Sequence, residues 1–287
     1  MNGNQDGDLL HQVQRATTRV LAEFDRVCKE LSTPYAAYGG TAIGAVRHGG
    51  FIPWDDDADV CMRREDYERF LREAPAALKD EFVLMSPRSH PDYPKTFAVL
   101  GLEGTEFTPG DAEGREFKVP IGVDIFPLDR MPVDVRSYRR QNRHTWLWGR
   151  MLFLHGSATP QAGLNGLVGQ AASAVFHGVH GGLHLARVKP AQLYRLWEHA
   201  ARQYEGSGSP LLGDYATQAP RHWSAKESEL FPTVRVPFEG IMVEIPRAFD
   251  AVLTRWYGDY MSLPPEEERV NHSAVRVDFG KHDFSQD

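Results

Sequence analysis

Asp57 and Asp59 stand two positions apart where an acidic run enters an apolar one, within the stretch YGGTAIGAVRHGGFIPWDDDADVCM. Side chains at this spacing share one face of a strand, so Ala58 and Val60 are predicted to face the core. Neighbouring carboxylates repel each other unless a cation or a proton lies between them. Mg²⁺ binds in proteins through one or two carboxylates together with substrate phosphates. In this setting the pair predicts a metal site, whereas the same pair in isolation would favour a solvated acidic turn.

A glycine pair, Gly39-Gly40, precedes these acids and suggests where phosphates bind. It follows a short apolar run, residues 35–38, that predicts a strand, and Thr41 begins a segment compatible with a helix. Paired glycines let the backbone turn sharply and approach a ligand closely. The first N–H groups of a helix are free to bind an anion. The N–H groups of Gly39, Gly40 and Thr41, with the Thr41 hydroxyl, are therefore predicted to bind phosphates.

A further acid, Asp124, interrupts a strongly apolar run over residues 119–126 that predicts another strand. A buried carboxylate is costly unless a cation pairs with it or hydrogen bonds satisfy it. The residues alone leave two interpretations open, a metal ligand and an edge-facing or hydrogen-bonded structural side chain. Asp129, which follows the same run, is predicted to lie in a turn.

Apolar periodicity predicts the elements that position these residues. Steps of three and four residues indicate amphipathic helices over residues 8–31 and 65–78. Short apolar runs indicate strands at 82–85 and 96–102 and a β-hairpin at 234–245. The predicted fold class is α/β (α+β), with a mixed, mostly antiparallel sheet flanked by helices. We expect a catalytic core at 1–135, which the family resemblance described below implies to be nucleotidyltransferase-like, a helical insertion or accessory lobe at 136–220, and a C-terminal hairpin, helix and tail at 221–287.

The middle of the chain is helical by pattern but carries no recognisable motif. Its first part is rich in arginine, and residues 151–186 contain no Asp, Glu, Lys or Arg. A basic helix of this kind is either a solvated face or a surface that meets anionic headgroups, and the uncharged tract is either a buried hairpin or an interfacial helix. A peripheral membrane contact through residues 136–190 is therefore one of the predictions. His177, His180 and His184 fall on one helical face, but the lack of a nearby carboxylate or cysteine argues against a metal site.

Composition limits the partners and the compartment. The chain has 287 residues with a formal net charge of −7, which argues against nucleic acid as a partner. Its two cysteines, Cys28 and Cys61, offer no disulfide framework and indicate a reducing compartment. The first ten residues lack the basic and apolar segments of a signal peptide. We expect a cytoplasmic protein, with the inner face of the cell membrane as the alternative if the membrane contact exists; the oligomeric state is left open.

The stretch GGTAIGAVRHGGFIPWDDDADVCMRREDYERF, which begins at Gly39, resembles the signature of the LicD family. The resemblance resumes at VDIFPLD, from Val123 to Asp129, and again after Phe231, while residues 136–220 match nothing familiar. Better-known relatives are bacterial phosphocholine transferases and the fukutin-related proteins. The family belongs to the nucleotidyltransferase-fold superfamily, which is marked by a G-G-[ST] turn and a downstream pair of carboxylates on a strand.

The resemblance implies a metal-dependent phosphotransferase. Such an enzyme moves a phospho-alcohol from a CDP-activated donor, such as CDP-choline, to a hydroxyl of a glycan or cell-surface precursor (lipopolysaccharide or teichoic acid), and releases CMP. Asp124 then becomes the third carboxylate beside Asp57 and Asp59, and the three together are the expected catalytic residues and ligands of Mg²⁺, with Mn²⁺ as a substitute. Asp124 is also the expected acceptor of the proton from the attacked hydroxyl.

Further contacts with the donor follow from charge and ring chemistry. Arg47, or else His48, is predicted to bind the phosphates. Trp54, or else Tyr260, is predicted to face the quaternary ammonium of choline. Two rival functions use the same acids: a nucleotidyltransferase that attaches a nucleoside monophosphate to an acceptor and releases pyrophosphate, and an inactive, binding-only member. The presence of Asp57, Asp59 and Asp124 argues against an inactive, binding-only member.

Overall fold

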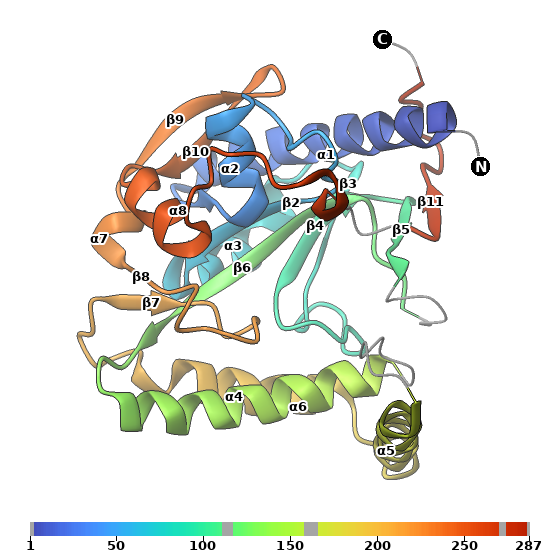
Figure 1. Ribbon diagram of the computed structural model, residues 1–287, viewed down its shortest axis with the longest axis vertical. Helices are drawn as coiled ribbons and strands as arrows, with labels where there is room; N and C mark the ends of the chain where they lie inside the picture. Colours follow the sequence, from blue (N-terminus) through green and yellow to red (C-terminus); the bar gives the residue numbers. More distant parts are fainter. Residues whose placement is uncertain (1–2, 111–116, 158–165, 270–273, 286–287) are drawn as a thin grey trace.

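The computed structural model describes residues 3–110, 117–157, 166–269 and 274–285. Its centre is a seven-stranded sheet whose main path runs β1-β2-β6-β4-β3, with β7 paired to β6 and β8 paired to β7 (Figure 1). β2 and β6 run parallel, and the other described pairings in this sheet are antiparallel. The strands are β1 (Ala36–Ala37), β2 (Ala58–Arg63), β3 (Phe82–Met85), β4 (Ala98–Leu102), β6 (Gly122–Met131), β7 (Leu211–Gly213) and β8 (Ala225–Lys226).

Two small sheets and the helices surround this centre. The hairpin β9 (Thr233–Phe238) and β10 (Ile241–Pro246) forms one sheet, and β5 (Glu106–Thr108) pairs with β11 (Arg276–Asp278) in the other. The predicted hairpin is therefore confirmed. The helices are α1 (Gly3–Leu31), α2 (Gly39–Arg47), α3 (Arg64–Ala77), α4 (Val135–Gly156), α5 (Gly166–Leu185), α6 (Pro190–Ala201), α7 (Glu227–Leu230) and α8 (Phe249–Tyr257).

The buried apolar side chains fall into two clusters. The larger one joins the central sheet to α1, α2, α3, α8 and the hairpin, and the rings of Phe24 and Phe70 meet in it with centroids 5.1 Å apart. The smaller one lies where α4 and α6 run side by side across one end of the sheet (Figure 1). Its members are Met131, Leu152, Leu183, Leu193, Tyr194, Trp197, Ala201 and Tyr215.

The predicted fold class is confirmed: a mixed sheet flanked by helices, carrying two of the predicted acids on neighbouring strands. One local prediction was wrong. Asp129 lies inside β6 instead of in a turn, because Arg64 offers it a partner within the protein. The carboxylate is 1% exposed and accepts hydrogen bonds from Arg64 Nε at 2.8 Å and Nη2 at 2.7 Å. The division into three parts stays a prediction.

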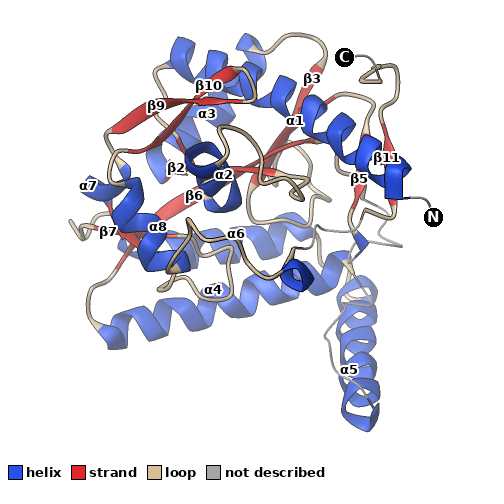
Figure 2. Ribbon diagram, turned by 45° about the horizontal axis from the view of Figure 1, so that its top comes forward, coloured by secondary structure: helices blue, strands red, loops and turns tan. Residues whose placement is uncertain are grey.

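The uncharged middle tract contains the end of α4 and all of α5, and α5 projects from the body of the molecule (Figure 2). The histidines of this region bond to backbone carbonyls. His180 Nδ1 lies 2.8 Å from the Leu154 oxygen, and His177 Nδ1 lies 2.8 Å from that of Ser173. Within the described part of the chain, no helix is both long enough and apolar enough to cross a membrane.

Candidate active site

The two strands that run parallel bring two of the predicted acids side by side. Asp59 on β2 and Asp124 on β6 are register partners, so their Cα atoms face each other across the strand pair. The alternation predicted for β2 is confirmed, since Ala58 and Val60 are fully buried while Asp57 and Asp59 stay partly exposed. Asp57 stands just before β2, at the same edge of the sheet. The sheet therefore holds acids from two strands at one place.

A tighter group of carboxylates lies immediately upstream. One oxygen from each of Asp55, Asp56 and Asp57 can be chosen so that all lie within 4.8 Å of one another. The loop that carries them is tied to α1, because Gln14 Nε2 donates to the carbonyl of Asp55 at 2.8 Å. The sequence analysis assigned the metal to Asp57, Asp59 and Asp124, so Asp55 and Asp56 are additional candidates that it passed over. Both sets consist of carboxylate oxygens, which are the ligands that Mg²⁺ and Mn²⁺ prefer.

The electrostatics of Asp59 fit a site built for a cation. Burial raises the pKa of its carboxyl well above the ordinary value, and the neighbouring Asp57, Asp124, Asp55 and Asp214 raise it further. A carboxyl in these surroundings favours its neutral form unless positive charge is close. A divalent cation among these oxygens reverses that preference, so the donor set and its charge both fit a bound metal ion.

The glycine pair at the start of α2 brings backbone against these carboxylates. Gly39 has φ +56°, a left-handed conformation that glycine adopts most easily. A Cβ on Gly40 would lie 2.7 Å from Asp55 Oδ2, so a larger residue there would displace that carboxylate. The N-terminus of α2 therefore faces acids. Phosphates at this end would need a cation between themselves and those acids, which is the arrangement that the sequence analysis predicted.

Thr41 ties α2 to β2. Its hydroxyl accepts a hydrogen bond from the backbone N–H of Asp59 at 2.8 Å, and its side chain is 3% exposed. This contact fixes the strand at the residue that carries the carboxylate. Direct binding of phosphate by the Thr41 hydroxyl stays a prediction.

Two other predicted donor contacts have partners within the protein. Arg47 donates through Nη1 to the carbonyls of Tyr260 at 2.7 Å and Ser262 at 3.1 Å, which ties α2 to the C-terminal segment. The ring of Trp54 has the guanidinium carbon of Arg269 5.4 Å from its centroid. Both residues stay predictions as substrate contacts, and the structure gives each of them a structural role as well.

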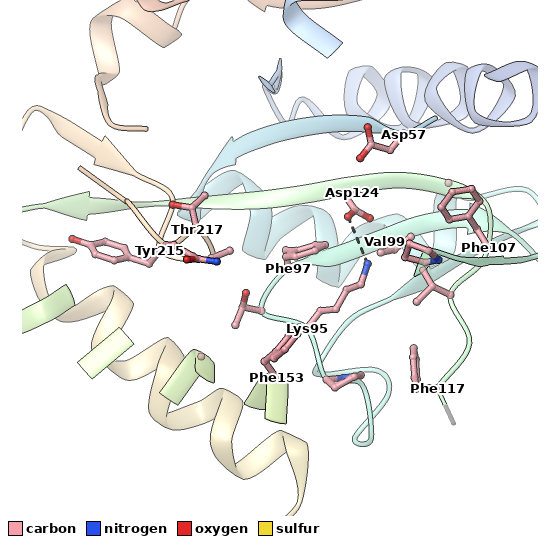
Figure 3. A pocket seen from close by; sticks show the side chains of 18 of the residues that line it. Asp57, Lys95, Phe97, Val99, Phe107, Phe117, Asp124, Phe153, Tyr215 and Thr217 are labelled. Carbon is pink, nitrogen blue, oxygen red and sulfur yellow. Dashed lines mark ion pairs between the residues drawn. The ribbon is translucent and has the colours of Figure 1, made fainter. Parts of the chain in front are cut away.

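Sequence reasoning missed Lys95 and the space beside it. Lys95 Nζ lies 3.6 Å from Asp124 Oδ2, and Figure 3 shows the two side chains pointing toward each other. Asp124 and Asp57 also line a cavity of about 430 Å³ that extends from the sheet to α4 and α6. The one available signal was position: Lys95 comes just before β4, the strand that pairs with the Asp124 strand.

The comparisons with known proteins agree with this geometry. Residues 32–95 match the family model described as LicD/FKTN/FKRP, nucleotidyltransferase domain. That range holds β1, α2, the acidic loop and β2, and it ends at Lys95. The chain is also 29% identical over 266 residues to the lipopolysaccharide cholinephosphotransferase LicD of Haemophilus influenzae, covering 92% of this chain and 95% of the relative. Both findings confirm the resemblance to the LicD family first seen around Gly39.

Proposed function

We propose that this protein transfers phosphocholine from CDP-choline to a hydroxyl of a lipopolysaccharide-type glycan and releases CMP. The observation that carries the proposal is the placement of Asp59 and Asp124 on paired parallel strands, with the glycine-led end of α2 next to Asp59. The likeness to a lipopolysaccharide cholinephosphotransferase over most of both chains supports the choice of cargo and acceptor.

In this proposal, the acids and the glycine pair have separate tasks that follow from their positions. Asp57, Asp59 and Asp124 would hold Mg²⁺, with Asp55 and Asp56 in reach, and the ion would supply positive charge where negative charge develops on the phosphates. The backbone N–H groups at Gly39 and Gly40 orient the donor diphosphate at the start of α2.

Proton transfer falls to Asp124, since this carboxylate borders the cavity. The acceptor hydroxyl oxygen bonds to the choline-bearing phosphorus and its proton passes to Asp124. The bond from that phosphorus to the bridging oxygen breaks, and the electron pair leaves with CMP. Lys95, beside Asp124, is placed to hold a phosphate oxygen during this step.

The direct test is a product assay on purified protein with Mg²⁺. CDP-choline, CDP-ribitol, CDP-glycerol, CTP and ATP are each offered with and without a lipopolysaccharide acceptor, and CMP and pyrophosphate are followed by mass spectrometry. We expect CMP from CDP-choline only when Mg²⁺ is present. The Asp57→Ala/Asp59→Ala variant should lose about 10³-fold in rate, because several kcal/mol of charge stabilisation disappear.

The matched control is Asp80→Ala, which removes an exposed acid outside the site and should leave the rate unchanged. Thermal unfolding of the double variant separates lost chemistry from lost folding, since removal of mutually repelling acids should not weaken the fold. Pyrophosphate from CTP or ATP would move the protein to nucleotidyl transfer. If CMP were still released after both substitutions, the assignment of Asp57 and Asp59 as catalytic acids would be wrong.

A further inference from the structure

The cavity beside Asp124 has two walls of different origin. One is formed by the sheet side, with Asp57, Asp124 and the segment that carries Lys95 and Phe97. The other is helical and comes from α4 and α6. Figure 3 shows Phe97, Phe153 and Tyr215 around this space, below the carboxylate of Asp124. The volume of about 430 Å³ is within the range of small-molecule sites and exceeds what a choline group alone requires.

The helical wall contains a buried donor without an acceptor. Trp197 lines the cavity and is 1% exposed, and its Nε1 has no hydrogen-bond partner among the described residues. A Cβ built on Gly149, which also lines the cavity, would lie 3.5 Å from Trp197 Cδ1 and 3.7 Å from Nε1. The indole N–H edge therefore faces a position that glycine keeps open. An unsatisfied buried donor destabilises the protein, and a ligand with an acceptor oxygen in the cavity would remove that cost.

Two of the aromatic rings on the cavity walls are poor sites for the choline group. Lys95 Nζ lies 4.8 Å from the centroid of the Phe97 ring, and the guanidinium carbon of Arg150 lies 5.9 Å from that of Trp146. Two aromatic rings that line the cavity thus already have a cation of the protein near them. A quaternary ammonium needs an aromatic face without a competing positive charge. Its trimethylammonium end also has no lone pair that could accept the N–H proton of Trp197.

A sugar ring fits the same walls. Its C–H faces can pack on Trp146, Phe153 and Tyr215, and its hydroxyls can meet polar side chains of the lining. Those polar groups include Thr96, Thr108, Thr145, Thr217 and Gln218. Arg150 and Lys95 would favour a saccharide that also carries phosphate or carboxylate groups. Apolar surface with a few polar groups at defined places is typical of a small-molecule subsite.

We propose that this cavity is the acceptor subsite, where a saccharide ring packs between the sheet and α4 and accepts a hydrogen bond from Trp197 Nε1. The inference rests on the proposed function, because it assigns the acceptor to the cavity and leaves the donor at the start of α2. The acceptor hydroxyl then reaches Asp124 from the cavity side. Donor and acceptor meet at the carboxylates from two directions, as in-line displacement requires.

The test observes the Trp197 indole directly by NMR of protein labelled with ¹⁵N at its six tryptophans. The probes are methyl glycosides of hexoses, a deacylated lipopolysaccharide core oligosaccharide and choline chloride, and Trp197→Phe assigns the signal. We expect the saccharides to shift the Trp197 N–H signal and choline chloride to leave it unchanged. Because Trp197→Phe also removes packing volume, a second variant carries the binding test.

That variant is Gly149→Ala, which adds one methyl group at ordinary contact distance from the indole and beside its N–H. Alanine also favours a helix interior over glycine, so the fold should become no less stable. We expect saccharide affinity to fall about three- to tenfold, the value of one hydrogen bond, while the KM for CDP-choline stays the same. Gly178→Ala is the matched control, since it changes a helical glycine on α5 with no neighbour within 4 Å.

The outcomes separate this inference from the proposed function. If choline chloride shifts the Trp197 signal and the saccharides do not, the cavity holds the cargo and the inference fails. If no probe shifts it while the wild-type protein releases CMP in the presence of lipopolysaccharide, the inference fails and the proposed function stands. Saccharide binding at Trp197 without any turnover would support the subsite and count against the proposed chemistry.

Discussion

The two walls of the cavity reach their positions by different physical means. On the sheet side, strand register fixes Asp59 opposite Asp124, and the hydrogen bond from the Asp59 N–H to the Thr41 hydroxyl ties this strand to α2. On the helical side, Trp197 and Gly149 are placed by the packing of α6 on α4 in the smaller apolar cluster. Register follows from the alternation of residues along one strand, whereas helix packing depends on which faces meet. The acids and the helical wall of this cavity are therefore held in place by different contacts.

Arg64 joins the two regions. It lies at the start of α3, bonds through both sides of its guanidinium to Asp129 on β6, and has its Nη1 3.8 Å from Glu198 on α6. Its guanidinium carbon also lies 6.0 Å from the centroid of the Trp197 ring. Both members of the pair with Asp129 are almost fully buried. Removal of one member leaves the other without compensation.

Breaking this junction should have the largest effect on folding. We expect Arg64→Met to lower the free energy of unfolding by about 3–5 kcal/mol, as seen when a buried ion pair loses one partner. Urea or guanidinium denaturation measures it. The Arg64→Met/Asp129→Leu variant should recover most of the loss, because no charge is then left buried. Arg69→Met, on the exposed side of the same helix, should cost less than about 0.5 kcal/mol. If Arg64→Met and Arg69→Met lowered the free energy of unfolding equally, Arg64 would not be the residue that joins the two regions.

Asp214 offers a second, smaller test at the same border. It follows β7, is fully buried, accepts from the Ala216 N–H at 2.7 Å, and has the Tyr38 hydroxyl 3.5 Å away. Burial is the main cause that raises the pKa of its carboxyl to about 7, with Asp129 adding to the effect and the hydrogen bonds opposing it. A raised pKa in the folded state means that the folded protein binds this proton more tightly than the unfolded chain.

Asp214 therefore makes the stability of the folded protein depend on pH. The contribution of Asp214 to stability is complete below the pKa of the unfolded chain, near 4, and is lost as pH rises toward 7. We expect Asp214→Asn to gain stability relative to the wild type over that interval, by a few kcal/mol at most. Parallel denaturation curves from pH 4 to pH 8 give the difference, with the exposed Asp80→Asn as the control. A difference that does not change with pH would show that Asp214 stays ionised in the folded protein.

The sheet side could largely be predicted because its signals are local. Alternation around Asp57 and Asp59 predicted the strand and its face, and the apolar run around Asp124 predicted a second strand, whose place beside the first was implied by the resemblance to the LicD family. Asp129 was missed for the opposite reason. A charged residue after an apolar run usually marks a turn, and its partner Arg64 is 65 positions away in the chain. A pairing over that distance leaves no trace in local periodicity.

The helical side could not be predicted for a related reason. Trp197 lies on the packed side of α6, but an apolar face does not reveal that one polar atom lacks a partner. The position of Gly149 beside the Trp197 indole follows only from the packing of α6 against α4. Lys95 acquires its role when β4 pairs with β6 and brings it to Asp124. Each of these functions depends on a contact between segments that the sequence does not bring near each other.

α5 packs on the helical side against α4, and two leucines on this helix measure how much it contributes there. Leu183 is 8% exposed and belongs to the smaller apolar cluster, while Leu185 is 87% exposed two residues later. We expect Leu183→Ala to cost about 2–3 kcal/mol, since it opens a cavity in packed side chains. Leu185→Ala should change stability by less than about 0.5 kcal/mol. Denaturation of both variants measures the contrast on one helix. Equal small costs would mean that α5 contributes nothing to the cluster around Trp197, so that α4 and α6 alone would have to hold the helical wall.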